Sequence, residues 1–341
     1  MIILLHLIAA LSLGTGATTT CRSVTLDPAP SWVSSMAWSP NGGEVVIGDI
    51  PAGRLLRYGK DGHFLGVVGA QKAAFGEYRP TEILTTREGF LVRSRAYEWF
   101  ELDSQFKVLH HLGPDGPLGL AMIEEVVSRN EIFGFGSVRK SSNTWAFGLQ
   151  HAKLSPLELI ETLEELQLDT KAGTLYTTLT PEVALAGGNP YALRFDEPSY
   201  LLNIRTHQRL KTFPKGFDHL PTLPPVTGPD SSVPRDRILQ KTSMPVALYG
   251  SGAYLFVLTR RPASDGKKVW ELHRIDPVKD MVTGSMILPT SAPDLTLAPG
   301  SEFWAILEKG PLTASSTREM KTLLLVPAAA IEKGNGQISC P

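Results

Sequence analysis

Short apolar runs separated by polar turns recur along most of the chain, and four of them follow one another near its start. They cover residues 33–38, 44–50, 54–58 and 64–68. The pairs Asn41-Gly42 and Asp61-Gly62 lie between runs, and such pairs favour the tight turns that connect antiparallel strands. This pattern predicts a four-stranded antiparallel meander over residues 32–70.

The same pattern returns later in the chain. It is clear over residues 80–113 and 244–290 and less regular over residues 118–168, 174–214 and 292–331. A period of roughly 40 to 50 residues with four strands in each unit is typical of a β-propeller. We therefore expect an all-β chain that forms a six-bladed β-propeller of four-stranded antiparallel blades.

The sixth unit lacks one strand. Its three predicted strands cover residues 294–297, 302–307 and 320–326, and no fourth run follows them. Residues 23–26 form a spare strand that precedes the first blade. We expect this N-terminal strand to close the ring by completing the last blade, because closure covers strand edges that would otherwise promote aggregation.

A family resemblance rests on the first two units. The segment from Gly48 to Gly66 contains the third strand, a turn and the Gly62-His63-Phe64 motif that leads into the fourth strand. It resembles the repeat of six-bladed NHL-type propellers, and residues 99–108 follow the same plan without the glycine. The Trp-Asp ending of the seven-bladed class is absent. The resemblance implies that the loops between second and third strands lie on the face where the central channel opens.

One segment of the third unit departs from this plan. Ser155-Pro156-Leu157-Glu158 forms a capping box with proline at the first helical position. Apolar residues follow with helical spacing at Leu159, Ile160, Leu163 and Leu166. We predict a short surface helix here, with an irregular outer strand as the alternative.

Residues 214–236 are rich in proline. Six prolines fall in this segment: Pro214, which begins it, and Pro221, Pro224, Pro225, Pro229 and Pro234. We predict a loop, and a loop of this length inside a compact domain is often functional or disordered.

The first residues indicate export. Residues 2–13 are almost wholly apolar, and the small residues 14–17 follow them. This pattern predicts a signal peptide over residues 1–17, although the start contains no Lys or Arg, and a buried N-terminal strand is the alternative. We expect a secreted or periplasmic protein whose residues 21–341 form a single domain.

The chain has two cysteines, Cys21 and Cys340. In an oxidising compartment, two cysteines that begin and end the mature chain most simply pair with each other. The termini would then meet in space. Two free buried thiols are the alternative.

The charge balance excludes some classes of partner. The chain contains 33 Lys and Arg and 34 Asp and Glu, for a net charge of −1, whereas nucleic-acid binding needs an excess of basic residues on one surface. We therefore expect no nucleic-acid partner. No run of 18 apolar residues is present, so we expect no transmembrane segment, and we expect a monomer.

Motifs of common catalytic sites are missing from the sequence. It contains no G-x-S-x-G elbow, P-loop, H-E-x-x-H motif or EF-hand loop. His110 and His111 are adjacent, and adjacent strand residues point to opposite faces, so they are poorly placed to bind one metal ion. We predict no metal site and no cofactor.

A comparison across blades gives a candidate binding surface. The residues where the second strand of each unit ends, or the third begins, are mostly arginine, and the candidate ligand-binding residues are Arg54, Arg93, Arg95, Tyr97, Arg139, Arg194, Arg260 and Arg261. Sixfold symmetry would bring them to one face, which we call the Arg-rich face. Arginine forks bind carboxylate, sulfate or phosphate groups, and Tyr97 and Tyr78 could stack on a sugar. The alternative is an ordinary solvated rim with salt bridges to Asp49, Glu82 and Glu308.

Two functions follow from this interpretation. The first is a non-catalytic propeller that binds an anionic small molecule, a glycan or a protein partner on its Arg-rich face. The second is an enzyme that resembles the lactonase, strictosidine-synthase-like or lyase propellers. That resemblance implies a divalent metal in the central channel. Glu308 and Lys309 occupy the aligned position in the sixth blade, but most aligned residues are arginine. We expect a cationic channel, which would repel a metal ion, and so favour binding; a metal-independent reaction with Tyr97 or Glu82 as proton carrier remains open.

Overall fold

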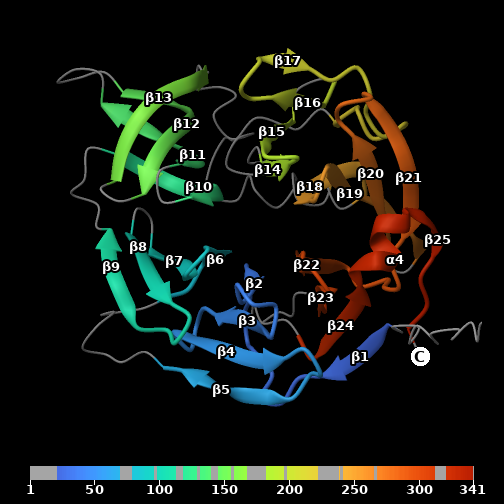
Figure 1. Ribbon diagram of the computed structural model, residues 1–341. Coiled ribbons are helices and arrows are strands. Elements are labelled where there is room, and N and C mark those ends of the chain that lie inside the picture. Colours follow the sequence, from blue (N-terminus) through green and yellow to red (C-terminus); the bar gives the residue numbers. More distant parts are fainter. Residues whose placement is uncertain are drawn as a thin grey trace, which may run out of the picture.

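A computed structural model shows six β-sheets arranged as blades around a central axis (Figure 1). It describes residues 21–69, 79–95, 98–112, 118–128, 131–139, 145–154, 157–166, 182–195, 198–221, 238, 241–264, 267–311 and 320–340. The predicted fold class, an all-β six-bladed propeller with four-stranded antiparallel blades, is confirmed.

The first three blades each run from the innermost to the outermost strand in chain order. Blade one contains β2 (Met36–Trp38), β3 (Glu44–Asp49), β4 (Arg54–Gly59) and β5 (Phe64–Val68). Blade two contains β6 (Glu82–Thr85), β7 (Gly89–Arg95), β8 (Glu98–Asp103) and β9 (Val108–Leu112). Blade three contains β10 (Leu118–Ser128), β11 (Glu131–Arg139), β12 (Trp145–Leu154) and β13 (Leu157–Leu166).

The remaining blades repeat this arrangement. Blade four contains β14 (Glu182–Ala186), β15 (Asn189–Arg194), β16 (Tyr200–Asn203) and β17 (Gln208–Arg209). Blade five contains β18 (Met244–Ser251), β19 (Tyr254–Pro262), β20 (Lys268–Asp276) and β21 (Met281–Ile287). Blade six contains β22 (Asp294–Ala298), β23 (Phe303–Lys309) and β24 (Thr322–Pro327).

The N-terminal strand closes the ring as predicted. β1 (Arg22–Thr25) pairs antiparallel with β24, so that Arg22 lies opposite Leu325 and Thr25 lies opposite Thr322. Blade six therefore has the order β1-β24-β23-β22. The start and the end of the propeller are joined within one sheet, as Figure 1 shows.

The C-terminal tail adds a second closure that the sequence did not predict. After β24, the short helix α4 (Ala328–Lys333) leads to β25 (Asn335–Gln337), which pairs parallel with β21 of blade five. The expected Cys21–Cys340 disulfide is present, with a Cα–Cα distance of 4.9 Å. It connects the residue before β1 to the tail beyond β25, so it links blades five and six.

Large apolar side chains fill the spaces between blades. One cluster joins blades five and six through Trp270 and Trp304, both fully buried, with Phe256 packed edge-on against Trp304. Burial of such aromatic side chains contributes strongly to stability. Each blade is thereby fixed against its neighbours, which also fixes the innermost strands around the axis.

The predicted helix in blade three is wrong, and the alternative strand is correct: residues 157–166 form β13. The strand pairs with β12 but contains two register shifts, in which Ile160 and Leu163 are the extra residues. Each bulge reverses the inward and outward alternation, so apolar residues with helical spacing fit a strand. Pairing with β12 therefore prevailed over the local capping signal; Ser155 and Pro156 lie outside the described residues.

Two other predicted segments are described in part or not at all. The signal peptide expected over residues 1–17 lies outside the described residues. Residues 214–221 contain no strand or helix, and residues 222–236 lie outside the described residues. In the described part of the chain, no helix is long and apolar enough to cross a membrane.

Candidate functional site

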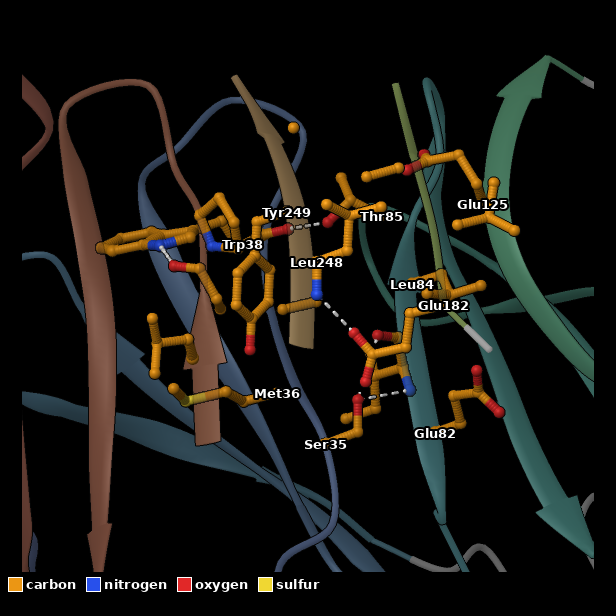
Figure 2. Close-up of a pocket in the computed structure, with 18 residues that line it drawn as sticks. Ser35, Met36, Trp38, Glu82, Leu84, Thr85, Glu125, Glu182, Leu248 and Tyr249 are labelled. Carbon is orange, nitrogen blue, oxygen red and sulfur yellow. Dashed lines mark hydrogen bonds between the residues drawn. The ribbon is translucent and has the colours of Figure 1, made fainter. Parts of the chain in front are cut away.

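The innermost strands surround a cavity of about 320 Å³ at the propeller axis (Figure 2). Residues from all six blades line it, and they come from β2, β6, β10, β14, β18 and β22 or their immediate ends. We call it the channel cavity. Its charged lining residues among those described are Glu82, Glu125 and Glu182, from three consecutive blades.

Glu182 is the first residue of β14, where it is followed by buried Val183 and Ala184. Its Oε2 atom accepts a hydrogen bond of 2.6 Å from the backbone N–H of Leu248 in the next blade. Burial raises the pKa of Glu182 to about 8; the Leu248 hydrogen bond opposes this shift and the charge of Glu82 adds to it. This carboxyl group therefore titrates near neutral pH.

Glu125 reaches the channel cavity because β10 is irregular. Ile123 pairs with Gly134 and Glu125 pairs with Phe133, so Glu124 is an extra residue in the strand. Bulges of this kind redirect side chains. Burial raises the pKa of Glu125 to about 7, against a weaker opposing hydrogen bond with the backbone of Val126.

Glu82 connects the channel cavity with the Arg-rich face. It begins β6 opposite Arg93 on β7, and Arg93 Nε lies 3.2 Å from Glu82 Oε2. Arg93 Nε also donates a 3.1 Å hydrogen bond to Thr81 Oγ1. Burial raises the pKa of Glu82 to about 7 even though the Arg93 charge lowers it.

Hydroxyl and indole groups of the lining hold neighbouring blades together. Ser35 Oγ accepts the N–H of Ile83 at 3.0 Å, and Thr85 Oγ1 donates to the carbonyl of Trp38 at 2.6 Å. Trp38 Nε1 donates to the Ala298 carbonyl at 3.1 Å. These bonds join blade one to blades two and six (Figure 2), so the strands that form the cavity wall are held to one another.

The charge of the channel cavity differs from the expected one. We expected a cationic channel, but the described residues that line the cavity include three glutamates and no Lys, Arg or His. Tyr249 also lines it, and burial, followed by the Glu182 charge, raises its pKa well above the ordinary value, so its hydroxyl is neutral. Carboxyl groups that titrate near pH 7 can either donate or accept hydrogen bonds, which suits a polar ligand.

Metal binding was tested on the same side chains. Over the described ranges, no group of three or more His, Cys, Asp or Glu side chains is arranged to hold a metal ion. The three glutamates thus face one cavity without forming a single ligand set.

Most described arginines of the Arg-rich face either pair with an acidic side chain or are buried. Arg54 Nε lies 2.9 Å from Asp49 Oδ2, Arg93 pairs with Glu82, and Arg261 pairs with Glu271. Arg194 is 3% exposed, and an Arg260 guanidinium nitrogen lies 3.3 Å from Met244 Sδ. The side chains of Arg95, Arg139, Tyr97 and Tyr78 lie outside the described residues. The partners of Arg54 and Arg93 are those that the alternative interpretation named, and ligand binding by this set of residues stays a prediction.

The channel glutamates were mostly missed in the sequence. Glu82 was considered as a salt-bridge partner and proton carrier, but Glu125 and Glu182 were not identified. The available signal is an acidic residue inside or at the start of an apolar run, as in Glu182-Val183-Ala184 and in residues 122–127. Such a residue on an innermost strand must face either a partner or a cavity.

Comparisons with known proteins support the fold alone. No protein-family model and no curated protein sequence matches the chain. Among solved structures, the chain is similar to a member of the DUF4221 family from Bacteroides vulgatus, with 10% identity, a TM-score of 0.56, and coverage of 90% of this chain and 96% of that chain. Similarity to U3-55K has 7% identity, a TM-score of 0.49, and coverage of 91% and 99%. A luciferin-regenerating enzyme shows 8% identity, a TM-score of 0.48, and coverage of 90% and 95%.

Proposed function

We propose that this protein is a non-catalytic binding propeller that holds a small polar ligand in its channel cavity. The observation that carries this proposal is the convergence of Glu82, Glu125 and Glu182 from three blades on one cavity. Carboxyl groups with strongly raised pKa values concentrate at functional sites, and a volume of about 320 Å³ falls in the range of small-molecule pockets.

The hydrogen bonds of the lining favour binding over reaction. The described lining hydroxyls of Ser35 and Thr85 donate to backbone carbonyl groups of adjacent innermost strands rather than to a base. They are therefore used to fix the wall and not to attack a substrate. A wall fixed in advance reduces the entropy lost when a ligand binds.

The Arg-rich face is a second candidate binding surface. Arg54 and Arg261 keep 30% and 49% of their side-chain surface exposed although each has an acidic partner. Arg261 also lies over the ring of Phe217, at 5.9 Å from its centroid. These groups could contribute to the binding of an anionic ligand, a glycan or a protein partner, as the sequence led us to expect.

A ligand screen by thermal shift separates the two surfaces. We expect Glu182→Gln to change the response to ligands of the channel cavity, whereas Arg261→Ala changes the response to ligands of the Arg-rich face. Glu302→Gln is the matched control, because Glu302 is 53% exposed and bonds Lys60 away from both surfaces. If every ligand found responds to Arg261→Ala and none to Glu182→Gln, the channel proposal is wrong.

We also propose that the protein is exported as a monomer after removal of residues 1–17, and that residues 21–341 form one domain of the NHL-like type. The Cys21–Cys340 disulfide supports an oxidising compartment. N-terminal sequencing of protein from the culture medium or periplasm tests the cleavage, and light scattering tests the monomer.

A further inference from the structure

The charges of the channel cavity indicate which ligand it would hold. Resting on the proposed function of this cavity, we propose that the ligand is a small organic cation, such as a diamine or a quaternary ammonium compound. It binds beside Tyr249 to the ionised carboxyl groups of Glu125 and Glu182, whose protons are released to the solvent on binding. This ligand class is inferred from the side chains that line the cavity, and not from the fold or from the similar structures.

The charges that line the cavity are not balanced. Glu82 has a basic partner in Arg93. In the part of the chain that the structure describes, Glu125 and Glu182 have no salt-bridge partner, and their recorded hydrogen bonds come from backbone groups of Val126 and Leu248. An uncompensated buried carboxylate is unfavourable, so it takes up a proton or binds a cation. An anionic ligand would add to the repulsion.

An aromatic ring forms part of the cavity wall. Tyr249 lines the same cavity and packs edge-on against Trp304, with the two ring centroids 5.8 Å apart. Its neutral phenol ring offers an electron-rich face, and ammonium groups bind such faces, particularly where water is excluded. A carboxylate beside an aromatic face matches an ammonium group better than it matches a sulfate or phosphate.

The size of the cavity suits an organic molecule. The carboxyl groups come from three separate innermost strands, and no described set of three acidic, His or Cys side chains could hold a single metal ion. The cavity of about 320 Å³ is roughly ten times the 30 Å³ that one water molecule occupies in the liquid. A cavity of this size has room for an organic molecule that carries separated positive groups, as a diamine does.

Proton displacement follows from the titration of the site. The charged and titratable groups around the cavity are Glu82 and Arg93 in blade two, Glu125 in blade three, Glu182 in blade four, Tyr249 in blade five and Asp294, whose charge acts on Tyr249, in blade six. Burial holds the pKa of Glu125 at about 7 and that of Glu182 at about 8. A bound cation favours the ionised forms, so binding releases protons near neutral pH and strengthens as the pH rises.

The test is isothermal titration calorimetry of the purified full chain with 1,4-diaminobutane and tetramethylammonium chloride as probes, in buffers free of amines, from pH 6 to pH 8.5. Calcium chloride, glucose and sodium sulfate serve as comparison probes. We expect a cation probe to bind, with affinity about a hundredfold or more higher at pH 8.5 than at pH 6. In unbuffered solution near pH 7.5, a pH-stat should add base as the probe binds.

Substitutions at Glu125 and Glu182 test whether the cation probe binds in the channel cavity. We expect Glu182→Gln and Glu125→Gln to weaken binding of the cation probe by about tenfold or more and to reduce the base added, while Glu302→Gln leaves both unchanged. Circular dichroism checks that each variant folds; Gln retains the shape of Glu and removes an unfavourable buried charge, so folding should persist.

The outcomes distinguish the ligand class from the site. Binding of glucose, calcium or sulfate that depends on Glu182, together with no binding of either cation probe, would overturn the cation proposal and leave the channel site in place. The cation proposal would also be overturned if the cation probe bound both variants as tightly as the parent, or if its binding released no protons. If no probe of any class responds to Glu125→Gln or Glu182→Gln, the proposed function of the channel cavity fails as well.

Discussion

The Arg-rich face and the channel cavity are formed by residues of the same blades, but their charges are balanced in different ways. On the face, Arg54 pairs with Asp49 inside blade one, and Arg261 pairs with Glu271 inside blade five. In the cavity, the described lining contains three glutamates and no basic residue. Arg54, Arg93 and Arg261 each find an opposite charge on a neighbouring strand. Among the described residues, Glu125 and Glu182 face the axis without such a partner, so a proton or a ligand must supply the balance.

The two regions also depend differently on the ring. Each described pair of the Arg-rich face lies within a single blade, so its geometry needs only local strand pairing. The channel cavity exists only when six innermost strands surround the axis, with hydrogen bonds such as Leu248 to Glu182 and Trp38 to Ala298 crossing between blades. Perturbations of the ring should therefore affect the channel cavity more than the Arg-rich face.

The largest expected effect is a stability change at high pH in Glu182→Gln. The folded-state pKa of Glu182 is raised from 4.5 to about 8 by burial, so its contribution to stability is fully present below pH 4.5 and is lost as the pH rises through 8. We expect the variant to match the parent near pH 4.5 and to exceed it by about 5 kcal/mol at pH 9. Urea unfolding at both pH values checks this; equal differences at the two pH values would contradict it.

Opening the ring should separate the two regions. Replacing both cysteines (Cys21→Ser and Cys340→Ser) should lower the free energy of unfolding by about 3 kcal/mol, because the disulfide holds β1 and the C-terminal tail together. Near the melting transition, we expect hydrogen exchange to increase first in β1, β24 and β25, and only later in β3 and β4, which hold the Arg54–Asp49 pair. Uniform exchange across all blades would contradict this order.

A histidine behind the Arg-rich face should lower stability in acid. His273 is nearly buried, with its ring nitrogens 2.9 Å from Thr259 Oγ1 and 2.7 Å from Ser285 Oγ. Burial, and then the charge of Arg261, lowers its pKa from 6.5 to about 4. Stability from the neutral ring is present above pH 6.5 and is lost as the pH falls through 4.

We expect His273→Gln to remove about 2 kcal/mol of this pH dependence, as measured by urea unfolding between pH 7 and pH 4. His63→Gln is the matched control, because His63 is 85% exposed. An unchanged pH dependence in His273→Gln would count against the assignment of this titration to His273.

The smallest effect is expected at the Arg-rich face itself. Arg54→Gln should lower stability by about 1 kcal/mol, because the buried Asp49 carboxylate keeps hydrogen bonds from the backbone N–H and the hydroxyl of Ser31, at 3.1 and 3.0 Å. The variant should leave binding in the channel cavity unchanged. A loss above 3 kcal/mol in urea unfolding would show that the pair is not a local rim contact.

Local pattern was sufficient for most strands. The turn residues illustrate this, since Asp61, Asp103, Asn203 and Asp276 each accept a backbone N–H two residues later at the turn into the outer strand. Such side-chain turns form wherever the local sequence allows them. The β13 segment was misassigned because its two bulges imitate helical spacing, and only pairing with β12 decided its structure.

The sequence by itself determined the six repeated units, the N-terminal closing strand and the pairing of Cys21 with Cys340, because apolar alternation, turn chemistry and cysteine count are all local or arithmetic properties. Tertiary structure decided the rest. The bulge that aims Glu125, the start of β14 that presents Glu182 and the tail that adds β25 to blade five depend on contacts between blades. Charge at the propeller axis depends on which side chains face inward, and one extra residue in a strand reverses that orientation.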